Sequence, residues 1–265
     1  MTAAPPEPGN PAVCLTRRPD GVALITLNRP KGNALSGAVL ESLSEVIGDL
    51  AAELPGAVVL WGGPRVFAVG ADVTEFEAPG AAQRVTEQFH AVTGALAALP
   101  RVTLAAICGY ALGGGLELAL ACDLRVAGHD AKLGQPEVHL GVLPGGGGTQ
   151  RLARLVGPAR AKDLIFTGRT LPAEEALALG VVDRVVAREQ VLEETLALAS
   201  QLAQGPVVAH GLAKAAIDQG LDTSLADGLR LEREAFVASF ATQDARRGIA
   251  SFLHEGPGKA TFVGR

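Results

Sequence analysis

Apolar residues recur with two different periods along the first two thirds of the chain. Short apolar runs bounded by turn-forming residues predict strands over residues 13–18, 22–27, 57–61, 102–107 and 124–127. Apolar residues at helical spacing predict helices over about residues 36–50, 81–99, 114–122, 150–155, 159–167 and 172–179. The run at 57–61 is wholly apolar, which is typical of a strand covered on both faces. Strands that alternate with helices predict an α/β layered core.

The pattern changes after about residue 187, where the strand signals stop. Beyond it, helices are predicted over residues 191–203, 206–219, 224–240 and 242–254. We therefore predict a tail at 1–12, an α/β core at 13–204 and a helical subdomain at 205–265. The tail is rich in Pro and Ala and lacks basic residues and long apolar stretches. It predicts disorder rather than a secretory signal or a transit peptide.

One apolar stretch has the composition of a membrane span. Residues 104–122 are apolar apart from Glu117, but Gly109 and the run Gly113–Gly115 interrupt them. Glycines weaken helices and a charge inside a membrane is expensive. A strand, a tight glycine turn and a buried helix explain the stretch better.

Composition narrows the classes of function. The 265 residues are 48% hydrophobic, and the net charge of −5 leaves no basic footprint for nucleic acid or a membrane surface. Cys14, Cys108 and Cys122 are odd in number and lack C-x-x-C spacing, so free thiols in a reducing cytoplasm are expected. The five histidines are scattered and predict no metal cluster.

The segment Gly113-Gly114-Gly115-Leu116-Glu117 joins a predicted strand to an apolar helix. Glycines let a ligand approach the backbone, and the first amides of a helix have no internal partners. Such a site suits an anion, or an oxygen that becomes one during reaction. The dinucleotide fingerprint, the P-loop and the G-x-S-x-G elbow are all missing from the chain.

Two carboxylates are candidates for acid/base chemistry, and each also has a structural explanation. Glu117 lies in the first turn of its helix, where it would complement the helix dipole, but its apolar neighbours favour a raised pKa. Glu137 follows Pro136, and this pair also commonly opens a helix. His139, two residues later, is more often a structural residue and is not assigned. The glycines at 145–148 indicate only an unusual backbone path.

The chain resembles the enoyl-CoA hydratase/isomerase (crotonase) family. The resemblance covers residue 13 to the end. It is carried by Asn28-Arg29-Pro30 with Asn33-Ala34-Leu35, and by residues 67–72, 108–117 and 134–152, with weaker matches at 166–168, 240–242 and 264–265. It implies a spiral of repeated ββα units, followed by helices that build trimers, often paired into hexamers.

The resemblance also implies a thioester oxyanion hole made by the N–H groups of Ala71 and Gly114. The interval of 43 residues between them fits hydratases of this family, as does the interval of 20 between Glu117 and Glu137. Hydratases use both glutamates, whereas the isomerases typically need only the one matching Glu137. We assign Glu117 to water activation and Glu137 to proton transfer at C2. An isomerase and an acyl-CoA-binding protein without turnover stay open as alternatives.

Contacts with coenzyme A are implied for a further set of residues, and each basic one could equally be a solvated surface charge. No cofactor beyond the coenzyme A of the substrate is expected. The implied contact residues are Arg29, Lys31, Ala34, Ala68, Asp72, Lys259 and Phe262.

Three features depart from the family pattern. Val69 stands near the oxyanion hole where a smaller residue is frequent, and Arg247 stands where an acidic residue is common. Residues 73–89 match no fixed pattern, so the preferred acyl length cannot be read.

Overall fold

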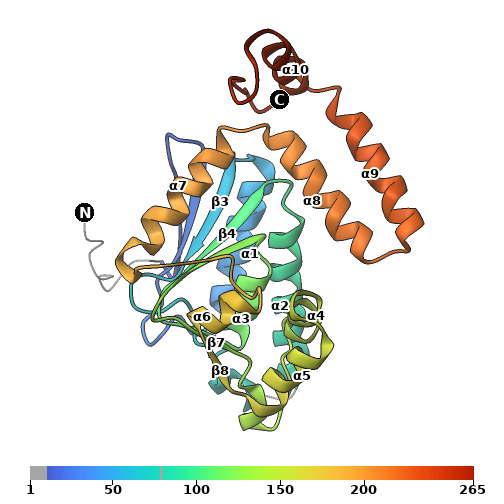
Figure 1. Cartoon of the computed structure of the whole chain (residues 1–265). Helices are drawn as coiled ribbons and strands as arrows, with labels where there is room; N and C mark the ends of the chain where they lie inside the picture. The colour runs from blue at the N-terminus through green and yellow to red at the C-terminus, as the bar shows by residue number, and fades with distance from the viewer. Residues whose placement is uncertain (1–10, 78–79) are drawn as a thin grey trace.

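Two β-sheets organise the chain (Figure 1). The computed structural model describes residues 11–77 and 80–265, so residues 1–10 of the predicted tail lie outside the described part. The larger sheet has the strand order β1-β2-β3-β4-β6-β9, with β1 antiparallel to β2 and the other pairs parallel. The smaller sheet has the order β5-β7-β8. The predicted α/β core is confirmed.

From β4 to β7, successive strands enter alternate sheets, so this part of the chain winds as a spiral. β4 (Val102–Ile107) joins the large sheet and β5 (Tyr110–Leu112) the small one, after which helix α3 (Gly114–Leu120) begins. β6 (Leu124–Gly128) and β7 (Lys132–Gly134) repeat the step. Parallel pairing of β4 with β6 and of β5 with β7 stacks one turn on the next. The predicted spiral of ββα units is confirmed.

The remaining elements complete this spiral and extend it. Their bounds are β1 Val13–Arg17, β2 Val22–Leu27, α1 Gly37–Ala52, β3 Ala57–Trp61, η1 Val73–Glu77, α2 Ala81–Ala98, η2 Glu137–Leu140, α4 Gly148–Val156, α5 Pro158–Thr167, β8 Thr170–Pro172, α6 Ala173–Ala178, β9 Arg184–Val186, η3 Arg188–Gln190, α7 Val191–Ala203, α8 Val207–Leu221, α9 Leu225–Ser239 and α10 Gln243–Glu255.

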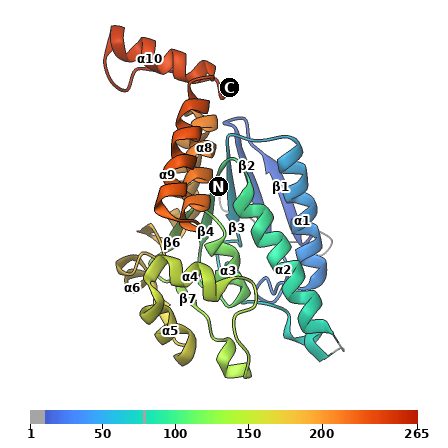
Figure 2. The ribbon, with the colours of Figure 1, turned by 90° about the vertical axis from the view of Figure 1, so that its right-hand side faces the viewer.

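Helices cover both faces of the large sheet. α1 and α2 lie on one face and α7 on the other (Figures 1 and 2). In β3, Val58 and Leu60 belong to the core shared with α1 and α2, while Val59 and Trp61 belong to the core shared with α7. Each fully buried residue of this size stabilises the fold by about 1.5–3 kcal/mol. The prediction that residues 57–61 are covered on both faces is confirmed.

The C-terminal part is helical, as predicted. β9 is the last strand of the described chain, and α7 to α10 follow it. α8 and α9 pack on each other, and α10 lies with the C terminus at one end of the molecule, far from β8 and α5 (Figures 1 and 2). A boundary near residue 204 stays a prediction.

The small sheet was not predicted. β5, β7 and β8 have three residues each, too few for an alternating pattern to appear. Their pairing partners are 20 residues or more away in sequence, so no local signal marks them. They matter because β5 ends where the candidate site begins.

Candidate active site

At each of the three positions at the start of α3, a different steric constraint requires glycine. Gly113 has a φ of 53°, in the left-handed region, and turns the chain from β5 into the helix. A methyl group on Gly115 would lie 2.2 Å from the Ala68 carbonyl oxygen, and one on Gly114 would lie 2.6 Å from the Phe89 ring. Close approach of three segments therefore requires this run of glycines.

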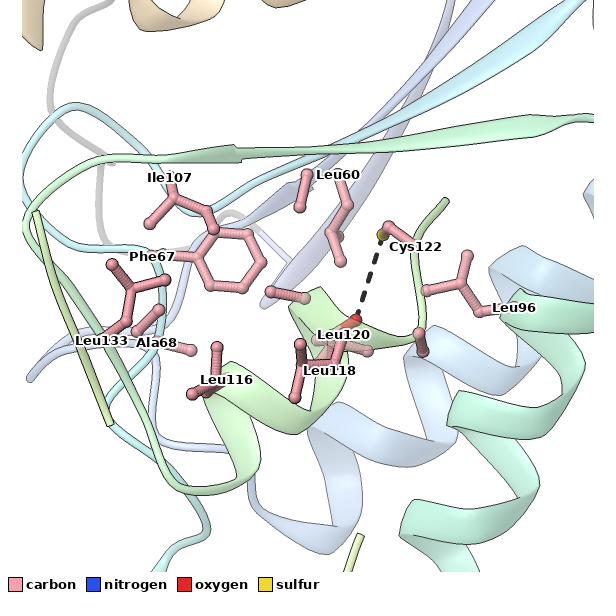
Figure 3. Packing of buried hydrophobic residues seen from close by; sticks show 14 of the residues in the cluster. Leu60, Phe67, Ala68, Leu96, Ile107, Leu116, Leu118, Leu120, Cys122 and Leu133 are labelled. Carbon is pink, nitrogen blue, oxygen red and sulfur yellow. Dashed lines mark hydrogen bonds between the residues drawn. The ribbon is translucent and has the colours of Figure 1, made fainter. Parts of the chain in front are cut away.

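The rest of α3 anchors this start in the core. Leu116 and Leu118 are 1% exposed and lie in one cluster with Phe67 and Ile107 (Figure 3). The predicted membrane-like stretch is thus a strand, a short strand and a buried helix of seven residues. Packing on every side fixes the direction in which the first amides of α3 point.

The structure brings Ala71 and Gly114 together, as the resemblance implies. A methyl group on Gly114 would lie 3.4 Å from the Ala71 nitrogen, and one on Gly70 would lie 3.7 Å from the Gly114 nitrogen. The Gly114 N–H is the first of its helix and has no intrahelical acceptor. Among the described residues, the Ala71 N–H likewise has no acceptor. Two neighbouring free donors suit an oxygen that gains negative charge.

Asn33 holds the loop that carries Ala71. Its buried Nδ2 donates to the carbonyl oxygens of Gly62 at 2.6 Å and Phe67 at 2.9 Å, and its Oδ1 accepts from the Arg29 N–H at 2.9 Å. The Leu35 N–H donates to the Gly70 carbonyl at 2.8 Å. These bonds fix the backbone immediately before Ala71.

Glu117 is buried, and its carboxylate accepts hydrogen bonds from the glycine loop, residues 145–148. It is 2% exposed, and its Oε1 accepts from the N–H groups of Gly146 and Gly148, both at 2.7 Å. Burial raises the pKa of Glu117, while the two N–H groups oppose that rise. Both bonds go to Oε1, so Oε2 is left to contact a ligand.

Glu137 lies at the start of η2, beside Gly113. A methyl group on Gly113 would lie 3.0 Å from Glu137 Oε1. Burial raises the pKa of Glu137 to about 7, and the charge of Glu117 adds to the rise, while its own backbone N–H opposes it. The buried amide of Gln135 donates to Glu137 at 2.8 Å from Oε1 when its nitrogen faces the carboxylate.

The four predicted catalytic residues therefore converge on one place. Burial and the charge of Glu117 raise the pKa of Glu137. Gly113 lies beside Glu137, and Gly114 lies beside Ala71. Two carboxyl groups in different environments can hold different protonation states, as an acid and a base require. The roles of these residues stay predictions.

The loop residues implied in coenzyme A binding lie next to this place. Arg29 donates to the Ala34 carbonyl and forms an ion pair with Asp72, both at 2.6 Å. Asp72 also accepts from the Thr74 hydroxyl, and the hydrogen bonds from Thr74 and Arg29 lower the pKa of Asp72 to about 2. Both charges thus have a structural role whether or not they contact a ligand.

Lys31 and Ala68 occupy different settings in the same region. Lys31 is exposed with a left-handed φ of 62°, so its ammonium group faces solvent. Ala68 is fully buried, and its carbonyl oxygen accepts a hydrogen bond from the Leu112 N–H at 3.0 Å. Its carbonyl is therefore engaged with β5, and contact of either residue with coenzyme A remains a prediction.

Lys259 and Phe262 are not brought to the other predicted residues. They follow α10, and the chain after it is fixed by Asp244, which accepts from the N–H groups of Val263 at 2.7 Å and Gly264 at 2.9 Å. α10 lies at the end of the molecule remote from α3 (Figures 1 and 2). Their proposed contact with coenzyme A finds no support within one chain.

Sequence reasoning missed Gln135 and the function of the glycine loop. Gln135 precedes Pro136 and is wholly buried, which a single polar letter cannot reveal. The glycines at 145–148 were recognised as an unusual path, and the structure gives the reason: a methyl group on Gly146 would lie 2.7 Å from Glu117 Oε2. His139 packs against Gly168 rather than facing the glutamates.

No helix in residues 11–77 or 80–265 is long and apolar enough to cross a membrane. Within the same residues, no group of three or more His, Cys, Asp or Glu side chains is arranged to hold a metal ion.

Paired sheets wound as a spiral, with two free amides beside a carboxylate pair, define a crotonase-type fold. The model of the enoyl-CoA hydratase/isomerase family matches residues 17–262. A probable enoyl-CoA hydratase of Mycobacterium bovis is 44% identical, over 91% of this chain and 95% of that protein. A crotonyl-CoA hydratase of Syntrophomonas wolfei is 37% identical, over 95% and 98%.

The solved structures agree with the sequence relatives. The crystal structure of an enoyl-CoA hydratase from Bacillus anthracis superposes with a TM-score of 0.91 at 35% identity, covering 96% of this chain and 100% of that one. The chain belongs to the enoyl-CoA hydratase/isomerase family.

We expect Gly146→Ala to lower kcat by about 100-fold or more, because its methyl group would collide with Glu117 and with Phe89 at 2.9 Å. Steady-state kinetics on crotonyl-CoA and circular dichroism would measure the effect. Gly94→Ala on α2 is the matched control, since its methyl group meets no atom within 4 Å. A Gly146→Ala protein as active as Gly94→Ala would contradict the packing described.

Proposed function

We propose that this protein is an enoyl-CoA hydratase, which adds water across the C2–C3 double bond of a trans-2-enoyl-CoA to give a 3-hydroxyacyl-CoA. The observation that carries the proposal is the buried carboxylate of Glu117 and the half-buried carboxylate of Glu137, in unlike environments beside one pair of free amides. The named hydratases among its relatives support the same reaction.

The thioester carbonyl oxygen would accept hydrogen bonds from the N–H groups of Ala71 and Gly114. Hydration places negative charge on this oxygen, as an enolate forms after water attacks C3. Donors that are fixed before the reaction stabilise this charge by roughly 3–4 kcal/mol each. The packing of α3 and the bonds of Asn33 supply that rigidity.

The two glutamates would divide the proton transfers. Glu117, ionised, takes a proton from water as the oxygen bonds to C3, and Glu137, protonated, gives a proton to C2. Each transfer contributes about 10²–10⁴-fold. After the reaction Glu117 is protonated and Glu137 is ionised. Transfer of one proton from Glu117 to Glu137, directly or through water, restores the initial protonation states.

Hydration of an enoyl-CoA by these residues requires no additional cofactor. Hydration involves no net oxidation, and the two amides supply the polarisation of the carbonyl. We therefore propose that the coenzyme A portion of the substrate is the sole cofactor involved, and that the protein works in the catabolism of fatty acids or related acyl-CoA compounds.

The second candidate is a Δ3,Δ2-enoyl-CoA isomerase, which the family also contains and which needs one carboxylate. The extensive fixing of Glu117 favours hydration, because an isomerase that used only Glu137 would leave a buried charge with no task. Burying a charge costs free energy, and an enzyme that did not use Glu117 to activate water would gain nothing in return.

Replacing each glutamate separates the two candidates. We expect Glu117→Gln and Glu137→Gln each to lose about 10²–10⁴-fold in kcat for crotonyl-CoA hydration, followed as loss of enoyl-thioester absorbance. Glu41→Gln, exposed on α1, is the control with the same charge change. For an isomerase, the Glu117→Ala protein keeps most of its activity on a 3-enoyl-CoA while Glu137→Ala loses it. An unmodified enzyme that leaves crotonyl-CoA and longer enoyl-CoAs unchanged would sink the hydratase proposal.

The raised pKa of Glu137 predicts the pH dependence. Glu137 must be protonated to act as the acid, and with a pKa of about 7 it loses its proton above that pH. We expect kcat/KM for crotonyl-CoA to fall about tenfold per pH unit above pH 7. The residual activity of Glu137→Gln should lack this limb. A wild-type profile that stays flat from pH 6 to 9 would be inconsistent with these roles.

We further propose that the protein forms a trimer or a pair of trimers in the cytoplasm. All three cysteines are free thiols, which supports a reducing compartment. Large apolar side chains are exposed on the C-terminal helices, more than single chains usually leave uncovered. They include Ile217, Leu221, Leu225, Leu229, Phe236, Val237, Phe240, Ile249, Phe252 and Leu253.

Sedimentation velocity at micromolar concentration tests the assembly. We expect species of three or six chains, because association covers the exposed apolar residues of α8 to α10. A species with the mass of one chain, 27.0 kDa, would refute it.

A further inference from the structure

Helix α2 presents three polar side chains to the glycine loop, which we define as residues 145–148. Thr86, His90 and Thr93 are spaced by four and three residues, so they share one face of the helix. The Thr86 hydroxyl donates to the Gly145 carbonyl at 2.5 Å, and His90 Nε2 donates to the same oxygen at 2.9 Å. The Thr93 hydroxyl lies 3.3 Å from the carbonyl oxygen of the next glycine. These contacts hold the carbonyl side of the loop.

The peptide group between Gly145 and Gly146 connects these contacts to the carboxylate. Its carbonyl accepts from Thr86 and His90, and its N–H donates to Glu117 Oε1 at 2.7 Å. A trans peptide is planar, with its C=O and N–H pointing in opposite directions. Fixing the carbonyl therefore aims the N–H, and a donor on the carbonyl side polarises the group and strengthens the bond to the carboxylate.

Three charged groups face Glu117, one from each element packed around it. His90 comes from α2, Arg151 from α4 and Glu137 from η2. The guanidinium of Arg151 is always charged and also donates to the Thr93 carbonyl at 3.4 Å. His90 is exposed to solvent.

We propose that His90, together with Thr86, is a positioning residue that keeps Glu117 in its ionised, water-activating form through the Gly145–Gly146 peptide group. The proposal rests on the hydration proposed above. His90 bonds to the far side of the peptide from the carboxylate, so its effect on the reaction passes through that group. It explains why a histidine lies against this loop although no proton transfer of the reaction requires one.

Two replacements of His90 separate its hydrogen bond from its charge. His90→Leu removes both, whereas His90→Gln keeps an N–H donor for the Gly145 carbonyl and loses the charge. His129→Gln, in the exposed turn between β6 and β7, is the control. At pH 8 we expect His90→Leu to lower kcat on crotonyl-CoA by about tenfold with KM changed less than about twofold, and His90→Gln to restore most of kcat.

The pH profile gives the readout that a merely structural role would not move. Losing the cation and the polarised peptide disfavours ionised Glu117, so the acid limb of kcat/KM should move to higher pH in His90→Leu. His90→Gln, which keeps the donor to the Gly145 carbonyl, should shift the acid limb less than His90→Leu does. Identical acid limbs in all variants, or equal loss in His90→Leu and His90→Gln at pH 8, would overturn the proposal.

A measurement without turnover separates this proposal from the proposed function. The carbon-13 signal of the Glu117 carboxyl group, assigned through Glu117→Gln, should titrate at higher pH in His90→Leu than in the wild type. Calorimetry with butyryl-CoA, which cannot be hydrated, should give equal affinity for both and so show an intact site. A wild type without hydratase activity defeats the function alone, and an unshifted titration defeats the role of His90.

Discussion

The carboxylate of Glu117 is buried in an apolar helix, and the surrounding elements offset the free energy of keeping it there. A buried charge without partners costs several kcal/mol, which would unfold a protein of ordinary stability. Two N–H groups at 2.7 Å on one oxygen offset this cost. They can approach so closely because Gly146 has no side chain. The glycine loop in turn needs support, and α2 provides it through Thr86 and His90.

The same constraint bears on the proposed division between acid and base. Burial raises the pKa of Glu117, and its two N–H groups and the charges of His90 and Arg151 oppose that rise. Burial raises the pKa of Glu137 to about 7, and the charge of Glu117 beside it adds to the rise. The two surroundings therefore differ, which supports the proposal that one carboxyl group acts as the base and the other as the acid. The first turn of α3 would contribute twice, since it begins with the Gly114 amide proposed for the thioester oxygen and carries Glu117 three residues later.

The sequence predicts those parts of the site that are marked by local patterns and misses those that depend on tertiary contacts. The helix start at Gly114 and the buried Glu117 were predictable, because glycines before an apolar helix are a local pattern. The small sheet was not, since three-residue strands carry no period. The polar face of α2 reads as a solvent face, and only tertiary packing shows that Thr86 and His90 touch Gly145. The ion pair of Arg29 with Asp72 also joins segments distant in sequence.

Val69 shows how a departure from the family pattern is accommodated. A larger residue beside the oxyanion hole is the one sequence feature that favours the alternative of an acyl-CoA-binding protein without turnover. In the structure, the Val69 side chain lies against Gly32, where a methyl group would lie 3.0 Å from its Cγ2. Gly32 has a φ of 89° and no side chain, so the extra volume of Val69 occupies space on the loop side. The bulk of Val69 therefore lies against Gly32, and the amides of Ala71 and Gly114 still lie side by side.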